Sequence, residues 1–129
     1  MKILVVEDEL TSRELLRVIL EPYGQVQTVP DGVEAVKAFN IALDREPFDL
    51  ICLDIMLPRM DGQQVLQGIR KIESERGVMG PDGVKILMIS ALGDFEHVTA
   101  AFASQCTSYI TKPIEAERIV EELRKLGLV

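Results

Sequence analysis

Hydrophobic and polar residues divide the chain into five short β-rich segments separated by longer amphipathic stretches. The segments cover residues 2–6, 26–29, 49–53, 84–90 and 108–111. Strands that alternate with helices in this way predict a parallel sheet. The first, third and fourth segments are almost continuously apolar, which is typical of central strands covered by helices on both faces. The more mixed segments around Val26 and Tyr109 are therefore expected at the sheet edges.

Apolar residues recur at helical spacing between these segments. Three stripes have this spacing: Leu15, Leu16, Ile19 and Leu20; Val65, Ile69 and Ile72; and Ile119, Leu123 and Leu126. Each stripe is expected to lie on a helix face that packs against the sheet.

Turn and cap signals separate the expected elements. Asp31-Gly32 and Asp61-Gly62 have the composition of helix starts, whereas Pro22-Tyr23-Gly24 and Gly127 mark helix ends. Residues 77–83 contain three glycines and one proline and are expected to form a solvated loop.

Length and composition narrow the class of protein. A chain of 129 residues with 47% hydrophobic and 27% charged residues fits one globular domain, residues 1–129. No apolar run approaches the roughly 20 residues of a membrane span, and no export signal precedes the first strand, so we expect a cytoplasmic protein. The net charge of −7 argues against direct binding of nucleic acid.

The cysteines and the single histidine point to no metal site of the zinc type. Cys52 and Cys106 are expected to remain thiols in a reducing compartment and to fill space in the core. Neither they nor His97, expected on an exposed helix, has zinc-ligand spacing.

Residues that can carry chemistry follow several of the predicted strands. They are Glu7, Asp8 and Glu9 after the first strand, Asp54 at the end of the third, Ser90 at the end of the fourth, and Lys112-Pro113 after the fifth. The carboxyl ends of parallel strands share one edge of the sheet, and ligands of open α/β sheets bind there. These side chains are therefore expected to converge.

The expected cluster suits phosphoryl transfer. Carboxylates without histidine or cysteine favour a hard cation, and Mg²⁺ is preferred because it needs only one or two carboxylates and can bridge to a phosphoryl oxygen. Lys112 and the Ser90 hydroxyl can each contact an incoming phosphoryl oxygen. Asp54, central and directly at a strand end, is the expected nucleophile that becomes an aspartyl phosphate.

Four motifs in order carry a family resemblance. They are Val5-Val6-Glu7-Asp8-Glu9, the stretch from Asp54 through Met56 and Pro58 to Asp61-Gly62, Ser90-Ala91 and Lys112-Pro113. Over essentially its whole length the chain resembles the response-regulator receiver domains of two-component systems. The resemblance implies a flavodoxin-like, doubly wound (βα)5 three-layer sandwich, with a five-stranded parallel sheet in the order 2-1-3-4-5. It also implies a signalling switch that assists its own phosphorylation and dephosphorylation, and not an enzyme.

The resemblance assigns a role to each candidate residue. Asp54 would accept a phosphoryl group from a sensor histidine kinase or a histidine phosphotransfer protein. Mg²⁺, for which Mn²⁺ can substitute, would be held by Glu7, Asp8, Asp54 and the backbone carbonyl of Met56. Lys112, joined to Pro113 by a cis peptide bond, would pair with the phosphoryl group.

The same resemblance implies how the signal leaves the site. Ser90 would move toward the phosphoryl group, and Tyr109 would turn inward. The surface of the fourth helix, fifth strand and fifth helix would then change and be read by a downstream effector protein or domain. Dimerisation on phosphorylation is left open.

The sequence departs from the family pattern at several places. Glu7 replaces the more usual aspartate, which favours a water-mediated metal contact. Gln105-Cys106-Thr107 stands where relatives often carry Gly-Ala, and the loop 77–83 is longer than usual. Met56 and Leu92 are apolar, which leads to the hypothesis that they restrict the attacking water and prolong the phosphorylated state.

Other functions fit the sequence less well. A flavodoxin-like electron carrier conflicts with the acidic run after the first strand, and a dinucleotide enzyme lacks Gly-x-Gly-x-x-Gly. An aspartyl-phosphate hydrolase or a pseudo-receiver that only binds partners remains open. So do plainer readings: Asp54 as a turn cap, Pro113 as the start of the last helix, and Tyr109 as an edge residue without a switching role.

Overall fold

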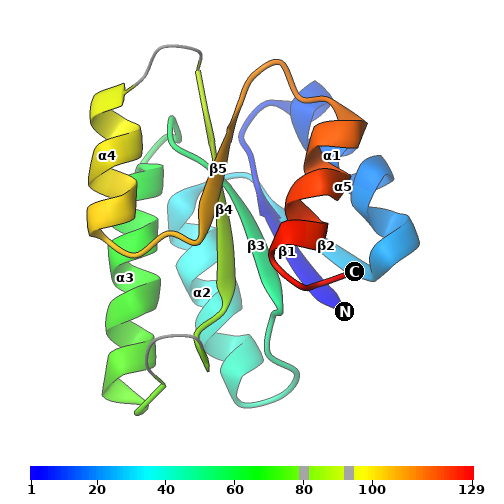
Figure 1. Cartoon of the computed structure of the whole chain (residues 1–129). Coiled ribbons are helices and arrows are strands. Elements are labelled where there is room, and N and C mark those ends of the chain that lie inside the picture. Colours follow the sequence, from blue (N-terminus) through cyan, green and yellow to red (C-terminus); the bar gives the residue numbers. More distant parts are fainter. Residues whose placement is uncertain (79–81, 92–94) are drawn as a thin grey trace.

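The fold is built on one parallel sheet. The computed structural model describes residues 1–78, 82–91 and 95–129. The strands are β1 (Lys2–Val6), β2 (Gln25–Val29), β3 (Leu50–Asp54), β4 (Lys85–Ser90) and β5 (Ser108–Thr111). They pair in the order β2-β1-β3-β4-β5, with every pair parallel (Figure 1). The predicted fold class and strand order are confirmed, and each predicted strand lies within one residue of an observed one at both ends.

Helices cover both faces of the sheet. They are α1 (Leu10–Leu20), α2 (Gly32–Leu43), α3 (Gly62–Glu75), α4 (Phe95–Ala103) and α5 (Ala116–Lys125), with a short 3₁₀ helix η1 (Glu21–Tyr23) after α1. Helices α1 and α5 lie on one face, and α2, α3 and α4 lie on the other (Figure 1). No helix among the described residues has the length and apolar character that crossing a bilayer requires.

Two hydrophobic cores lie on opposite faces of the sheet. Along β1, Leu4 and Val6 contribute to the core beneath α2, α3 and α4, whereas Ile3 and Val5 contribute to the core beneath α1 and α5. All five residues of β3 are buried, while β2 alternates between exposed and partly buried positions before Val29. The central strands and the edge positions of β2 and β5 are thus as predicted.

The predicted helix starts and ends are confirmed at several points. The Asp31 side chain accepts a hydrogen bond from the Glu34 amide at 2.9 Å, and Asp61 forms a capping box with Gln64 at the start of α3. Residues 21–24 end α1 through η1, and Gly127 follows α5 with a φ of 75°.

One prediction about the helix stripes is wrong. Leu15 does not pack against the sheet but is 42% exposed. Successive residues of an α-helix are rotated by about 100°, so when Leu16 and Leu20 point at the sheet, Leu15 points away from it. Ile19, Ile72 and Leu126 are partly buried at the margins of the two cores.

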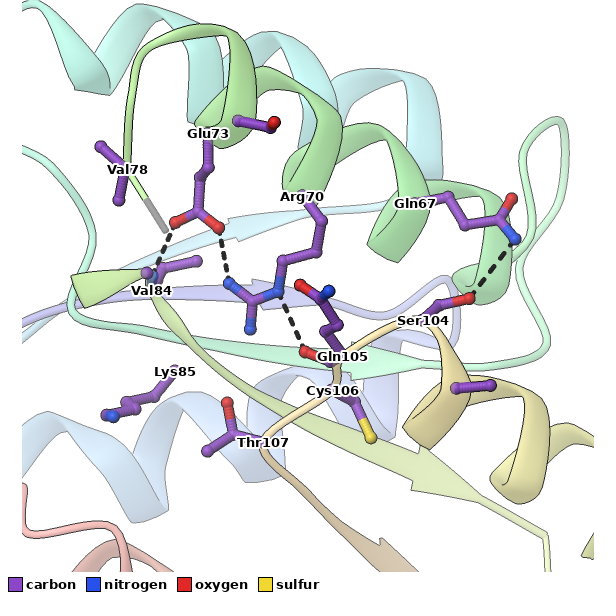
Figure 2. Close-up of a pocket in the computed structure, with 13 residues that line it drawn as sticks. Gln67, Arg70, Glu73, Val78, Val84, Lys85, Ser104, Gln105, Cys106 and Thr107 are labelled. Atoms are coloured by element: carbon purple, nitrogen blue, oxygen red, sulfur yellow. Dashed lines mark hydrogen bonds and ion pairs between the residues drawn. The ribbon is translucent and has the colours of Figure 1, made fainter. Parts of the chain in front are cut away.

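The end of the sheet opposite the candidate site holds a polar network around a cavity of about 680 Å³ (Figure 2). Arg70 on α3 donates to the Gln105 carbonyl at 3.0 Å and pairs with Glu73 at 2.6 Å. Gln105 has a φ of 72°, in the left-handed region that glycine adopts more readily than other residues. The entry to β5 is therefore shaped by Arg70 in this chain. Of the loop 77–83, residues 79–81 lie outside the described part.

Candidate functional site

The predicted site residues lie close together at the carboxyl edge of the sheet. Asp54 is the last residue of β3, and Lys112 follows β5. The Lys112 ammonium lies 2.8 Å from Asp54 Oδ2 and 3.6 Å from Glu7 Oε2. The Lys112 amide donates to the Ser90 carbonyl at 2.8 Å, and the Lys112–Pro113 peptide bond is cis, as predicted.

Three carboxylates form a compact acidic cluster. Glu7, Asp8 and Asp54 each offer an oxygen within 4.8 Å of the others; Glu7 and Asp54 are buried, and Asp8 is exposed. An all-oxygen set with one side open to solvent matches the ligands of Mg²⁺, which takes few carboxylates and keeps several waters. The residues present therefore fit the predicted cation.

The positive charge of Lys112 does not fully compensate the buried acids Glu7 and Asp54. Burial, together with the adjacent Asp54 carboxylate, raises the pKa of Glu7 to about 8, although the Glu9 amide and Lys112 oppose this rise. Burial disfavours the charged form of Lys112, but its contacts with Asp54 and Glu7 outweigh this and raise the pKa of the ammonium. Lys112 therefore stays charged, and a second cation would stabilise ionised Glu7.

The Asp54 carboxylate is held in one orientation. Its Oδ1 accepts the Met56 amide at 2.9 Å, and its Oδ2 accepts from Lys112. The Ile55 amide donates to the Ile89 carbonyl of β4 at 3.0 Å. The Met56 side chain is 64% exposed beside the acid. Asp54 thus caps the turn that follows it, as the plainer reading expected, and it also pairs with the Lys112 ammonium.

Two buried polar atoms at the site have no hydrogen-bond partner among the described residues. They are Glu7 Oε2 and Ser90 Oγ. Buried polar groups nearly always have a hydrogen-bond partner, whereas Glu7 Oε2 has only the longer ion pair with Lys112 at 3.6 Å. Both atoms belong to residues for which sequence reasoning predicted a partner, a cation for Glu7 and a phosphoryl oxygen for Ser90.

Tyr109 lies next to Ser90 on the neighbouring strand. Met88 pairs with Tyr109 and Ser90 pairs with Thr111, so Ser90 and Tyr109 share the face of the sheet that α4 covers. The Tyr109 ring is half-buried and meets the exposed Phe102 of α4 edge-on, with centroids 5.6 Å apart. Its predicted switching role stays a prediction, and Leu92 lies outside the described residues.

Sequence patterns did not single out Arg59. Its guanidinium lies 3.2 Å from the Asp31 carboxylate, which is 28 positions away in the chain. No periodicity or motif links residues so far apart, and only the spatial proximity of the two loops reveals the pair.

Comparison with known proteins identifies the family. The family described as response regulator receiver domain matches residues 3–124. Chemotaxis protein CheY of Listeria monocytogenes is 31% identical, and the match covers 97% of each chain. The receiver domain of NtrX from Brucella abortus is 35% identical with a TM-score of 0.78, covering 97% of this chain and 98% of that one.

Some relatives are much longer than this chain. The DNA-binding dual master transcriptional regulator RpaA of Synechocystis is 32% identical, and the match covers 97% of this chain but 48% of RpaA. The match to probable histidine kinase 2 of rice covers 12% of that protein. The chain therefore spans half or less of these relatives. It belongs to the family of response regulator receiver domains, the signalling switches of two-component systems.

Proposed function

We propose that Asp54 accepts a phosphoryl group in a Mg²⁺-dependent reaction and that the phosphoaspartate changes the α4-β5-α5 surface. The donor would be the phosphohistidine of a sensor histidine kinase or histidine phosphotransfer protein. An Asp54 oxygen would form a bond to phosphorus while the bond between phosphorus and the histidine nitrogen breaks. The leaving imidazole would keep the electron pair and take up a proton.

The contact of Lys112 with Asp54 carries this proposal. A buried carboxylate at the sheet edge, 2.8 Å from an ammonium and next to two further acids, combines a nucleophile with a fixed positive charge. Phosphoryl transfer depends mainly on such positioning and on offsetting charge at the equatorial phosphoryl oxygens. Lys112 can donate to one of these oxygens, and the Ser90 hydroxyl, which has no partner among the residues that the structure describes, can donate to another.

The proposed Mg²⁺ ligands are Asp8, Asp54, the Met56 carbonyl and Glu7, the last through water because its side chain is longer than aspartate. When bound, the ion would neutralise negative charge on the phosphoryl oxygens. This chain's own residues would orient the acid through the Met56 amide and hold the positive charge through Lys112.

The proposed output passes through Ser90 and Tyr109. Movement of the Ser90 hydroxyl toward the phosphoryl group would alter the surroundings of Tyr109, which shares its face of the sheet and packs against Phe102 on α4. A downstream effector would read the changed surface. We also propose that residues 1–129 form one cytoplasmic receiver domain that does not itself contact nucleic acid.

Incubation with acetyl phosphate and Mg²⁺, followed by intact mass measurement, tests the proposal. The wild-type chain should gain about 80 Da, one phosphoryl group. Asp54→Asn should gain none, while Asp44→Asn, a control at an exposed aspartate in an ion pair with Arg76, should behave as wild type. A wild-type chain without the adduct, or an Asp54→Asn chain that still acquires it, would overturn the proposal.

A further inference from the structure

The loop between β3 and α3 contains Arg59, a residue with unusual backbone geometry. Its φ of 66° lies in the left-handed region, which non-glycine residues seldom adopt unless the surroundings hold them there. The same loop contains Met56, whose amide holds Asp54 and whose carbonyl is a proposed Mg²⁺ ligand. What fixes Arg59 therefore bears on the geometry of the site.

The guanidinium of Arg59 reaches across to the loop between β2 and α2. It lies 3.2 Å from Asp31 Oδ2; the Arg59 side chain is 58% exposed, and the Asp31 side chain is 10% exposed. The other oxygen of Asp31 accepts the Glu34 amide at the start of α2. Asp31 is thus anchored to a helix, and it offers Arg59 a fixed partner.

Backbone packing brings the two loops together at the same place. A Cβ added at Gly32 would lie 2.2 Å from the Met60 carbonyl oxygen, so only glycine permits this approach. Within the loop, the Met60 amide donates to the Pro58 carbonyl at 2.7 Å, and the Gly62 amide donates to the Ile55 carbonyl at 2.8 Å. The base of the loop is closed by its own backbone, whereas its tip is held by Asp31 and Gly32.

We propose that Arg59 and Asp31 are a positioning pair that holds the loop from residue 55 to 61 in the conformation that binds Mg²⁺. The pair does not touch the reacting atoms. It acts through the loop, whose Met56 presents an amide to Asp54 and a carbonyl to the ion. This inference rests on the proposed function, because it assigns the loop a role in binding the proposed cation.

Magnesium affinity, measured by titration calorimetry, tests the pair. Arg59→Gln should raise the Kd for Mg²⁺ about two- to fivefold, the range expected of a partly exposed ion pair. Asp31→Asn removes the charge but keeps an oxygen for the Glu34 amide, and it should give a similar rise. The double variant should be no worse than either single variant, because one interaction is lost in all three. Arg59→Lys should recover part of the affinity.

A matched control separates this effect from the loss of any surface arginine. Arg76 pairs with Asp44 at 2.9 Å and is 43% exposed, and both residues cap helix ends away from the acidic cluster. Arg76→Gln should leave the Kd for Mg²⁺ unchanged. Equal losses in Arg76→Gln and Arg59→Gln, or a wild-type Kd in Arg59→Gln, would overturn the positioning claim.

Amide hydrogen exchange without metal gives a second readout. In Arg59→Gln the Met56 and Met60 amides should exchange faster, while the Glu34 amide stays as protected as in wild type. A wild-type chain that binds no Mg²⁺ would count against the proposed function, and the exchange rates would then decide the positioning claim alone. Unchanged exchange at Met56 and Met60 would overturn it.

Discussion

Lys112 is the residue on which the charge balance of the site depends most. It contacts both buried acids, Asp54 and Glu7, and those contacts keep it charged despite partial burial. The flanking backbone fixes its position, since its amide donates to the Ser90 carbonyl. A substitution here therefore removes charge from the site without removing a proposed metal ligand.

Lys112→Met should lower the rate of phosphorylation by acetyl phosphate about a hundredfold, the effect of removing one group that stabilises transition-state charge. Mg²⁺ binding should remain or become tighter, because a competing positive charge is gone. The time course of the intact mass measures the rate, and Lys37→Met, at an exposed lysine on α2, is the control. A rate within twofold of wild type would argue against a phosphoryl contact for Lys112.

Substitution of Ser90 should affect phosphorylation without lowering the stability of the unphosphorylated chain. Its hydroxyl is buried without a partner among the described residues, so Ser90→Ala should leave the free energy of unfolding unchanged or raise it by up to about 1 kcal/mol. Once phosphorylated, the Ser90→Ala variant should lack the hydrogen bond from the hydroxyl to the phosphoryl group. The variant should therefore also become phosphorylated more slowly than wild type. Urea denaturation and the phosphorylation time course measure the two effects. Destabilisation of the unphosphorylated variant by about 2 kcal/mol would mean that the hydroxyl already has a partner.

At the scale of elements, the first residue of α3 determines how closely this helix approaches β3, the strand that ends with Asp54. A Cβ at Gly62 would lie 2.3 Å from the Asp54 carbonyl oxygen and 2.7 Å from Ile55 Cα. Both are backbone atoms and cannot rotate away. Gly62 is therefore required by packing, and Asp61 before it caps the helix.

Gly62→Ala should destabilise the fold by about 1–3 kcal/mol, as overpacking does, and weaken Mg²⁺ binding because Asp54 must shift. Gly68→Ala in the same helix is the control. The Cβ added at Gly68 would lie 3.7 Å from Val36 Cγ2, an ordinary contact. The free energy of unfolding of this variant should therefore rise by about 0.5–1 kcal/mol. Denaturant unfolding of both variants measures the difference, and equal effects would contradict the packing argument.

The elements were largely predictable, because strand ends and caps depend on local patterns. Apolar runs located the central strands, and Asp-Gly pairs located the starts of α2 and α3. The side of α1 that packs against the sheet was harder to predict from the sequence. Leu15 and Leu16 are equally apolar, and only the rotation of the helix about its axis decides which one is buried. The left-handed Gln105 was not predictable either, because Arg70, distant in sequence, holds its carbonyl.

At the scale of the whole molecule, the parallel sheet brings together groups that are far apart in sequence. The predicted meeting of Glu7, Asp8, Asp54 and Lys112 followed from the rule for carboxyl ends of strands, and the distances bear it out. The rule does not predict which of these side chains are buried or which partners they contact. It could not indicate that Glu7 is buried with a raised pKa, that Ser90 Oγ has no hydrogen-bond partner within the described part of the chain, or that Arg59 pairs with Asp31.

If the proposed function holds, the acidic edge of this sheet forms an acyl phosphate at one residue, Asp54. Reduction with borohydride after treatment with acetyl phosphate and Mg²⁺, followed by peptide mass mapping, tests it most directly, because an acyl phosphate is reduced to an alcohol and a phosphoserine is not. We expect homoserine at position 54 and nowhere else. Intact Asp54 with phosphate on Ser90, or reduction at a different aspartate, would contradict it.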